Sequence, residues 1–427
     1  MASKKFDLVV FGASGFTGQY VVDEVSRVAA VEKLTWAIAG RSMAKLQKIL
    51  REASSRTGKN LEKIPIIIAD TTNQPSLDDM AKQARVVLNC VGPYRFYGEP
   101  VVRACIEHGA HHLDISGEPQ YLETMQLLYD KKAKENNVLV IGAAGFDSIP
   151  AEAGVMYLQD KFENGRLTGI ESYLSIQHGP QGGGINFATY ESAVHGISHA
   201  KELIGLRKSL YPEAMPKLQH RLVRRPNRFY SEDVNKWCLH FMGSDKSVVY
   251  RTIRNHLTTG VMKHPIEFFP YLCLASLFSA LKFVTFWSMF TFLSQYSFGR
   301  WILLKFPQVF TLGYVTKAGP TQEQTDTTTF SMTYVGYGFD SNEAASAGGK
   351  PNRRVLARLS APDLGYVTTS ICLVQSGVIV LKEAGSMRHS SGVLTPGAAF
   401  FGTSLLQRLE KHNIKIVTLS DTVGAKL

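Results

Sequence analysis

The turn between the first apolar run and the first helical segment constrains the fold of this chain more than any other feature. Phe6–Phe11 is typical of a buried strand, and residues 19–29 have helical periodicity. They are joined by Gly12-Ala13-Ser14-Gly15-Phe16-Thr17-Gly18. In such a turn the first glycine permits a tight bend, the second lets the backbone approach phosphates, and the third lets helix and strand pack closely. Because the helix then presents free N–H groups, the turn predicts a site for the pyrophosphate of a dinucleotide.

The alternative is a tight strand-to-helix turn in another kind of α/β domain, because a glycine motif alone has low specificity. The pattern of the following residues favours the dinucleotide site. Short apolar runs alternate with helical spacers, which predicts a doubly wound parallel sheet with right-handed crossovers. The further expected strands are residues 34–39, 65–69, 86–91, 113–116 and 138–141.

The end of the second expected strand indicates which dinucleotide binds. NAD sites usually carry Asp or Glu there to bond the ribose 2′-OH, but this chain has Arg41 followed by Ser42. A planar guanidinium suits a 2′-phosphate, which favours NADP(H) over NAD(H). The alternative role of Arg41 is to cap the turn or to pair with a surface acid. Asp70, after the third strand, is expected either to accept from the adenine amino group or to cap the next helix.

The loop at residues 89–97 is a candidate wall of the nicotinamide pocket, because ligands of doubly wound sheets lie beyond the carboxyl ends of the strands. Its candidate cofactor residues are Asn89, Gly92, Pro93 and Tyr94. The candidate acid–base residues are Tyr94, Tyr97, Glu118, Asp147 and His178. Each has a structural alternative: packing for the tyrosines, helix capping for Glu118 and Asp147, and a surface loop for His178. The sequence therefore assigns no catalytic residue.

Composition and charge bound the possible partners. The chain has 427 residues, enough for two or three domains with cores of their own. Its five cysteines have no metal-ligand spacing, which predicts reduced thiols and no metal. The net charge is +11, and residues 201–263 hold 13 Lys and Arg against 5 Asp and Glu. This basic block is either a solvated face or a surface that meets anionic lipid, and no nucleic-acid partner is expected because no RNA-binding or zinc-finger pattern is present.

Residues 265–306 form an unusually apolar stretch. Two almost uncharged segments, 268–281 and 283–298, are separated by Lys282 alone. Neither reaches the roughly 20 residues of a spanning helix, so they favour a hairpin or a helix that lies in the membrane interface, with Lys282 reaching the headgroups. The aromatic residues suited to that zone are Phe268, Phe269, Tyr271, Trp287, Tyr296 and Trp301. The alternative is a buried helix pair in a homodimer interface.

Seven segments, taken together and in order, resemble the saccharopine dehydrogenase family, most of all its animal branch of oxidoreductases. They are GASGFTG at 12–18, AGRS at 39–42, VLNCVGPYRFYGEPVVRAC at 87–105, HLDISGE at 112–118, GFDSIPAE at 145–152, GPTQEQ at 319–324 and LTPGAAF at 394–400. The resemblance implies an NAD(P)-binding Rossmann domain at residues 1–150 and a second α/β domain at 151–395. It also implies that a C-terminal segment, 396–427, returns to the first domain. Alternating residues at 170–177, 328–335 and 354–359 predict a mixed sheet in the second domain.

The resemblance also bears on the substrate. Saccharopine enzymes bind a doubly anionic amino-acid conjugate through convergent arginines, and Arg95 and Arg103 lie near the expected loop. The region that contacts substrate in those enzymes is replaced here by the basic and apolar insertion, and enoyl reductases of mycobacterial lipid synthesis are relatives. The expectation is therefore an NADP(H)-dependent oxidoreductase acting on a lipophilic carbonyl or enoyl substrate. The alternative is a non-catalytic dinucleotide sensor or scaffold at a lipid surface.

The expected location is the cytosolic face of a membrane or lipid droplet, with residues 265–306 as the attachment. One alternative is the peroxisome, because Ala425-Lys426-Leu427 is close to the Ser-Lys-Leu address. The other alternative is a soluble cytoplasmic protein.

Overall fold

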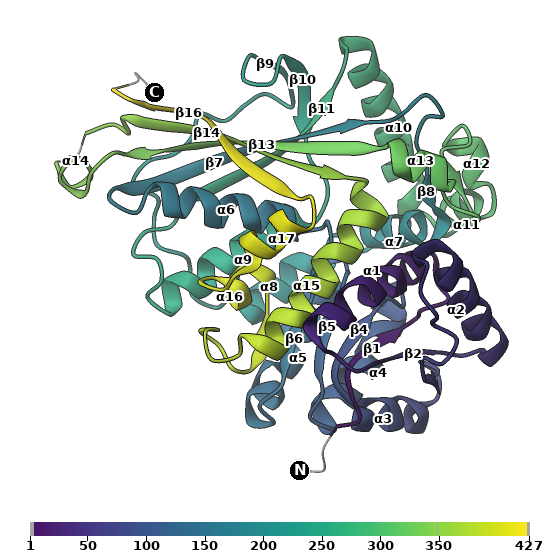
Figure 1. Cartoon of the computed structure of the whole chain (residues 1–427). Helices are drawn as coiled ribbons and strands as arrows, with labels where there is room; N and C mark the ends of the chain where they lie inside the picture. The colour runs from purple at the N-terminus through teal and green to yellow at the C-terminus, as the bar shows by residue number, and fades with distance from the viewer. Residues whose placement is uncertain (1–3, 348, 425–427) are drawn as a thin grey trace.

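The computed structural model describes residues 4–347 and 349–424, and within these residues the chain forms two seven-stranded sheets and a short two-stranded sheet (Figure 1). The first sheet has the order β15-β6-β5-β4-β1-β2-β3, and its strand pairs are parallel. The second is mixed, in the order β16-β14-β13-β7-β11-β10-β9. The expected α/β fold, with a Rossmann-type sheet and a second mixed sheet, is confirmed. Ala425-Lys426-Leu427 lies outside the described residues.

The first sheet consists of β1 (Phe6–Phe11), β2 (Trp36–Gly40), β3 (Ile66–Ile68), β4 (Ala84–Asn89), β5 (His111–Asp114), β6 (Leu139–Ile141) and β15 (Gly392–Leu394). Its helices are α1 (Phe16–Glu32), α2 (Met43–Thr57), α3 (Gln74–Gln83), α4 (Tyr94–Glu107), α5 (Pro119–Glu135) and α15 (Thr369–Lys382). The alternation of β1 explains the layers: Leu8 and Val10 pack with α1, α2 and α15, whereas Val9 and Phe11 pack with α3 and α4. Both faces are therefore covered, which is why these strands are almost continuously apolar.

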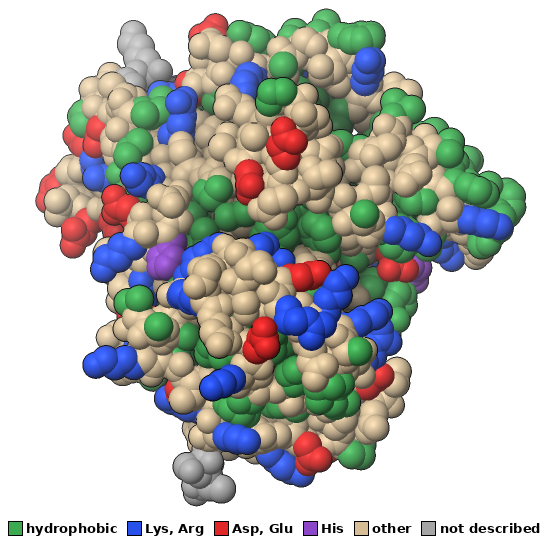
Figure 2. Space-filling model, turned by 45° about the vertical axis from the view of Figure 1, so that its right-hand side comes forward, with side chains coloured by type: hydrophobic (Ala, Val, Ile, Leu, Met, Phe, Trp, Pro, Cys, Tyr) green, Lys and Arg blue, Asp and Glu red, His purple; other side chains and the backbone are tan. Residues whose placement is uncertain are grey.

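The second sheet consists of β7 (Arg166–Gln177), β9 (Arg228–Ser231), β10 (Lys236–His240), β11 (Glu267–Leu274), β13 (Thr329–Phe339), β14 (Arg353–Pro362) and β16 (Lys415–Val423). The two-stranded sheet pairs β8 (Ile185–Asn186) with β12 (Val315–Thr316). The remaining helices are α6 (Ile149–Lys161), α7 (Phe187–Ser198), α8 (Glu202–Leu210), α9 (Asp245–Thr258), α10 (Leu277–Gln295), α11 (Ser297–Lys305), α12 (Pro307–Phe310), α13 (Gln322–Thr327), α14 (Asn342–Ser346), α16 (Pro396–Phe400) and α17 (Leu405–Lys411), with a π-helical turn at Leu364–Thr368. In the space-filling view the first domain lies below the second, and the two meet along a seam with apolar side chains (Figure 2).

The apolar stretch does not form the expected pair of short membrane segments. Its first part is β11, which pairs with β7 and β10 inside the second sheet. Phe268 and Tyr271 are buried there, so they cannot lie in a headgroup zone. A strand covered on both faces is as uniformly apolar as a membrane segment, which is why the sequence pattern was misleading. The second part is the continuous helix α10, which runs through Lys282 without a break.

The exposed apolar surface of α10, α11, α12 and the turn that follows is here called the apolar ridge. Its members are Leu277, Phe278, Leu281, Val284, Met289, Phe292, Tyr296, Phe298, Trp301, Phe306, Val309 and Leu312. In the described residues, α10 and the segment Leu364–Lys382 are long and apolar enough to cross a membrane by length and composition. They differ in burial: 17% of the apolar window is buried in α10 against 78% in Leu364–Lys382, which is therefore a core helix.

The return of the chain to the first domain begins earlier than residue 396. Helix α15 packs on the first sheet, where a Cβ on Gly377 would lie 3.1 Å from Leu88, and β15 pairs with β6. Beyond residue 396, β16 instead joins the edge of the second sheet beside β14. The C-terminal segment touches the first domain through α17, where Arg408 is 2.8 Å from Glu32 of α1. Short-range periodicity does not reveal which sheet a three-residue strand such as β15 joins.

Candidate dinucleotide site

The glycine turn has the steric features that its sequence predicts. Gly12 has a φ of +84°, and a Cβ there would lie 2.7 Å from the Val91 side chain. A Cβ on Gly18 would lie 3.0 Å from the carbonyl carbon of Gly12 and closer still to its oxygen, so α1 could not pack on the turn. Gly15 is the exposed N-cap of α1 and makes no side-chain cap, while Ser14 and Thr17 are partly exposed beside it. The first-turn N–H groups of α1 are thus left available to an anion.

The end of β2 carries a cation rather than an acid. Arg41 is exposed directly after Gly40, and Ser42 caps α2 by accepting from the Lys45 N–H at 3.4 Å. Asp70 accepts from both the N–H and the hydroxyl of Thr72 at 2.9 Å. These hydrogen bonds, together with the nearby Arg41 guanidinium, hold the pKa of Asp70 below its usual range.

The helix-capping alternative for Asp70 does not hold. Asn73 is the N-cap of α3, and its side chain accepts from the Ser76 N–H at 3.3 Å. Asp70 instead shapes the turn before α3, beside Arg41, and its bond to adenine stays a prediction.

The loop after β4 is organised by its own side chains. Asn89 is buried, and its Oδ1 accepts from the Val91 N–H at 3.0 Å. The hydroxyl of Tyr94 donates to the Asn89 carbonyl at 2.9 Å, and Gly92 and Pro93 lead directly into α4. Burial raises the pKa of Tyr94 well above its usual range. Tyr94 therefore packs and braces this loop, and its hydroxyl is committed to the backbone.

Glu118 occupies the N-cap position of α5, as expected, but its side chain makes no cap hydrogen bond there and instead serves α4. Its carboxylate accepts from the N–H groups of Tyr94 at 2.9 Å and Arg95 at 3.1 Å, at the start of α4. The Arg95 guanidinium donates to the His195 carbonyl and to Gln120. Glu118 thus fixes the entry of α4, and Arg95 links that helix to the second domain.

The other candidates lie in different places. Tyr97 is 38% exposed, and Arg103 donates to Gln74 of α3. His178 is exposed at the end of β7, where its Nδ1 is 3.1 Å from the Thr328 hydroxyl. Asp147 is not the cap of α6, because that position belongs to Ser148. The structure therefore does not gather the sequence candidates into one catalytic group.

An aromatic cluster that the sequence reasoning missed covers the start of α1. The ring of Phe16 packs edge-on to Tyr366 with centroids 4.6 Å apart, and Tyr20 stacks on Tyr366 at 5.6 Å. Tyr366 is tied to the second domain because its hydroxyl accepts from the Asn186 N–H at 2.8 Å. Gly319 approaches so closely that a Cβ would lie 2.5 Å from the Phe16 ring. The sequence signal that could have pointed to this cluster is the GPTQEQ segment at 319–324, which begins with Gly319.

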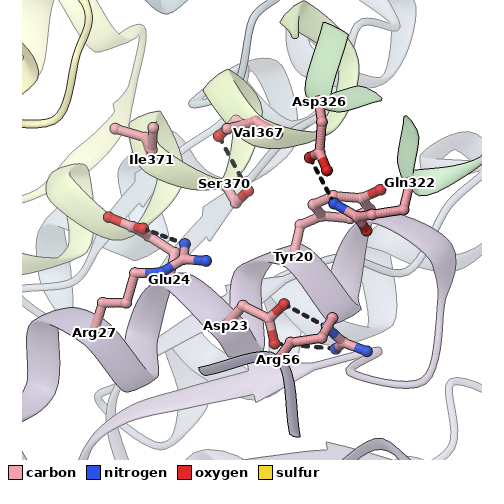
Figure 3. Close-up of a pocket in the computed structure, with 10 residues that line it drawn as sticks. All are labelled: Tyr20, Asp23, Glu24, Arg27, Arg56, Gln322, Asp326, Val367, Ser370 and Ile371. Carbon is pink, nitrogen blue, oxygen red and sulfur yellow. Dashed lines mark hydrogen bonds and ion pairs between the residues drawn. The ribbon is translucent and has the colours of Figure 1, made fainter. Parts of the chain in front are cut away.

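A pocket of about 310 Å³ lies beside α1, between the two domains (Figure 3). Its lining residues are Tyr20, Asp23, Glu24, Arg27, Arg56, Gln322, Asp326, Val367, Ser370 and Ile371. It lies along the flank of α1 rather than at the carboxyl ends of the strands, so it is not the place where a doubly wound sheet holds its ligand.

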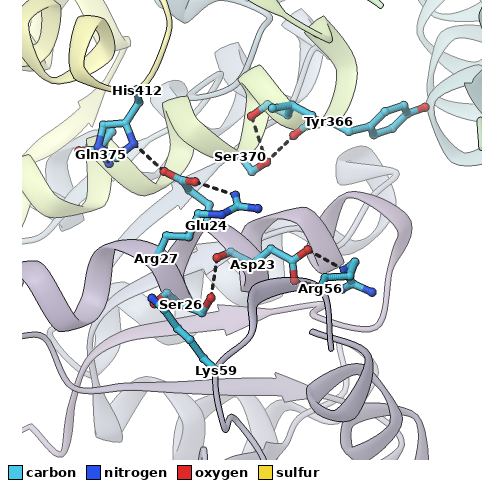
Figure 4. A network of polar contacts seen from close by, with 11 residues as sticks. Asp23, Glu24, Ser26, Arg27, Arg56, Lys59, Tyr366, Ser370, Gln375 and His412 are labelled. Atoms are coloured by element: carbon cyan, nitrogen blue, oxygen red, sulfur yellow. Dashed lines mark hydrogen bonds and ion pairs between the residues drawn. The ribbon is translucent and has the colours of Figure 1, made fainter. Parts of the chain in front are cut away.

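Ion pairs on the same flank of α1 join it to neighbouring elements (Figure 4). Arg56 of α2 binds both oxygens of Asp23, at 2.7 and 3.0 Å. Glu24 lies 3.2 Å from Arg27 and 2.9 Å from the Nδ1 of His412. The hydrogen bonds from His412 and Arg27 hold the pKa of Glu24 below its usual range despite burial. The charges are therefore compensated internally, and the network fixes α1 against α2 and the C-terminal segment.

The described residues fit a dinucleotide better than a metal. Among residues 4–347 and 349–424 no group of three His, Cys, Asp or Glu residues has the arrangement of a metal site. The glycine turn, in contrast, packs closely against Val91 and its own backbone and leaves the start of α1 without a side-chain cap, so its N–H groups can meet a phosphate. The residues that would hold the cofactor are those of the turn, Arg41 and the loop after β4.

The N-terminal part of the chain resembles a known dinucleotide-binding domain. Residues 8–141 match the family model described as the saccharopine dehydrogenase NADP binding domain. The saccharopine dehydrogenase-like oxidoreductase of Homo sapiens is 44% identical over 425 residues, which cover 98% of both chains. The lipid droplet localized protein of Caenorhabditis elegans is 37% identical and covers 96% of this chain and 97% of its own. A Mycobacterium tuberculosis protein, provisionally described as a trans-acting enoyl reductase, is 27% identical and covers 97% of this chain and 98% of its own.

The fold has a solved counterpart. The apo saccharopine dehydrogenase (L-Glu forming) of Saccharomyces cerevisiae matches 97% of this chain and all of its own, with a TM-score of 0.55 and 13% identity. At that identity the match supports the fold alone, whereas the full-length relatives establish the relationship. The chain belongs to the saccharopine dehydrogenase-like oxidoreductase family and contains its NADP-binding domain.

Proposed function

We propose that this chain is an NADP(H)-dependent oxidoreductase that acts on a lipophilic carbonyl or enoyl compound at a lipid surface. The observation that carries the proposal is the glycine turn at the start of α1 with Arg41, not an acid, at the end of β2. The first-turn amides of α1 would hold the pyrophosphate, and Arg41 would meet the 2′-phosphate. When bound, the reduced nicotinamide supplies a hydride.

The arginines near the loop support a substrate other than a doubly anionic conjugate. Arg95 is occupied by the His195 carbonyl and Gln120, and Arg103 is held by Gln74 at the surface of α3 and α4. Both guanidinium groups thus already make contacts within the protein. A lipophilic substrate does not need them, and one relative is described as an enoyl reductase.

The apolar ridge supports attachment of the protein to a lipid surface. Phe278, Phe292 and Trp301 are 66%, 62% and 50% exposed, an arrangement that costs free energy in water. Lys282 lies 4.4 Å from the Phe278 ring centroid and Lys305 lies 4.5 Å from that of Trp301. Ammonium groups beside exposed aromatic rings suit the boundary between acyl chains and headgroups. A relative named for lipid droplets matches this chain in sequence over nearly the whole length of both.

Titration with NADPH and then with lipid extracts tests the enzymatic part. We expect saturable NADPH binding. We then expect either oxidation of NADPH when at least one lipid fraction is added, or reduction of NADP⁺ when the reduced lipid product is added. Tight binding with no hydride transfer for any fraction would reject catalysis and favour the sensor or scaffold. Absence of NADPH binding would reject both.

Charge substitutions on the apolar ridge test the lipid surface. Deleting residues 268–300 is unsuitable because β11 belongs to the sheet core, so the test uses Phe278→Glu, Phe292→Glu and Trp301→Glu together. The control variant carries Val31→Glu and Leu128→Glu, at positions 81% and 57% exposed on α1 and α5. We expect the ridge variant to lose flotation with lipid droplets and phospholipid vesicles, whereas the control floats as the wild type does. Unchanged flotation would refute lipid attachment. If flotation is unchanged and the ridge variant turns from a dimer into a monomer, the apolar ridge binds a second copy of the chain.

A further inference from the structure

Two helices begin against each other at the carboxyl end of β6. Ser148 is the N-cap of α6, Ser244 is the N-cap of α9, and their Oγ atoms are 3.3 Å apart. Asp147 precedes the first cap and Asp245 follows the second. Helix α6 leaves the first sheet and α9 belongs to the second domain, so the junction brings together two carboxyl groups from distant parts of the chain.

The two aspartates lack partners for part of their carboxyl groups. Asp245 is 1% exposed and Asp147 is half-buried, and the Oδ1 atom of each has no hydrogen-bond partner among the described residues. Burial raises the pKa of both, and the negative charge of Asp147 raises that of Asp245 further. Ionisation of one carboxyl therefore opposes ionisation of the other, and the two titrate as a pair.

The surrounding groups do not neutralise the pair. Glu152 of α6 is buried, and its own pKa is raised to about 7. Burial lowers the pKa of His256 on α9 to about 4, so this imidazole is neutral. Arg251 donates to Gln126, and the Tyr334 hydroxyl of β13 donates to the Pro150 carbonyl. A proton is therefore the available means of reducing the charge of the two aspartates.

The backbone of two glycines, one from each domain, lies against the Asp147 carboxyl. A Cβ on Gly117, just past β5, would lie 2.9 Å from Oδ2, and one on Gly243 would lie 3.2 Å from Oδ1. Ligands of doubly wound sheets bind beyond the strand ends, and the loops after β4 and β5 form the expected nicotinamide side. Asp147 is thus an acid at this edge that is not committed to a structural hydrogen bond, unlike Glu118 and Tyr94.

We propose that the Asp147–Asp245 pair is the proton donor and acceptor of the redox reaction, with Asp147 facing the substrate and Asp245 retaining the shared proton. This inference rests on the proposed function. In the reducing direction a bound reduced nicotinamide would supply a hydride to the carbonyl carbon, and the C=O π pair would move to oxygen. That oxygen would take the proton of the pair, giving an alcohol and leaving the oxidised cofactor, and water would then reprotonate the carboxylates. Oxidation reverses each transfer.

The test is the proton balance of nucleotide binding, because NADP⁺ carries a positive nicotinamide ring and NADPH does not. Calorimetric titration near neutral pH in buffers of different ionisation heat gives the number of protons released. We expect the wild type to release protons on binding NADP⁺ but not NADPH, because the ring charge favours ionisation of the pair. Asp147→Asn and Asp245→Asn should each abolish this release while still binding NADPH. Asp160→Asn, an exposed position on the same helix, should release as the wild type does.

The outcomes separate this inference from the proposed function. Binding of both nucleotides with no difference in proton release, or the same release in Asp147→Asn as in the wild type, overturns the inference and leaves the oxidoreductase standing. If neither nucleotide binds, the proposed function fails and the inference fails with it. Carbon-13 spectra of aspartate-labelled protein identify the proton: a carboxyl signal that stays protonated at neutral pH in the wild type must disappear in Asp245→Asn. Retained NADPH binding shows that each variant is folded.

Discussion

Replacing Gly18 by alanine tests whether the glycine turn is built as described. In an ordinary helix a glycine-to-alanine change stabilises a protein by about 0.5–1 kcal/mol. At Gly18 the new Cβ would lie 3.0 Å from the Gly12 carbonyl carbon and 3.0 Å from the Ala13 Cα, which are backbone atoms that cannot rotate away. Overpacking of this kind costs about 1–3 kcal/mol. We therefore expect a net loss of about 1–2 kcal/mol, with α1 displaced from β1.

Two measurements check this prediction. Urea unfolding gives the stability, and NADPH titration gives the effect on the site. If α1 is displaced, its first-turn N–H groups no longer meet the phosphates, and NADPH binding should weaken by roughly tenfold or more, or about 1.4 kcal/mol. The matched control is Gly196→Ala in α7, where a Cβ meets nothing within 4 Å and should stabilise the chain. A Gly18→Ala variant with wild-type stability and an unchanged NADPH Kd would refute the steric reasoning.

Two further predictions concern buried carboxyls. Glu118→Ala removes the acceptor of the Tyr94 and Arg95 amides, so the free energy of unfolding should fall by about 1–3 kcal/mol, and unchanged urea midpoints would contradict the capping role. Glu152 has a pKa of about 7 in the folded protein, against 4.5 ordinarily. Between pH 4.5 and about 7 the folded protein therefore keeps a proton that the unfolded chain has lost. The free energy of unfolding should fall as pH rises through this range. Glu152→Gln should remove that pH dependence and stabilise the protein at about pH 8 by about 1–3 kcal/mol; a slope equal to that of the wild type would show that Glu152 does not carry it.

The first domain could be predicted well from the sequence because its signals are local. The apolar run of Phe6–Phe11, the glycine turn and the alternation of short strands with helices need no tertiary information. The assignment of family followed from motifs spread along the whole chain. The first strand matched its expected bounds, and the parallel order of the sheet followed from the crossovers.

The parts that could not be predicted depend on contacts between distant residues. Strand β11 has the same apolar composition as a membrane segment, and its pairing with β7 and β10 decides between the two. Helix α15 and strand β15 complete the first sheet from the far end of the sequence. The carboxyl pair arises because α6 and α9 begin at one point, and no spacing motif connects Asp147 with Asp245. Glu118 was expected to cap the following helix, but it accepts from the start of α4 instead.

The most direct test of the central claim is the effect of Arg41→Asp on the Kd values of NADPH and NADH. A charge-assisted bond from Arg41 to the 2′-phosphate contributes about 1.5–3 kcal/mol, which corresponds to roughly a 10- to 150-fold change in Kd. We expect the variant to lose this factor for NADPH, with a change of less than about threefold for NADH, which has no 2′-phosphate. Equal losses for the two nucleotides, or an unchanged NADPH Kd, would contradict the central claim.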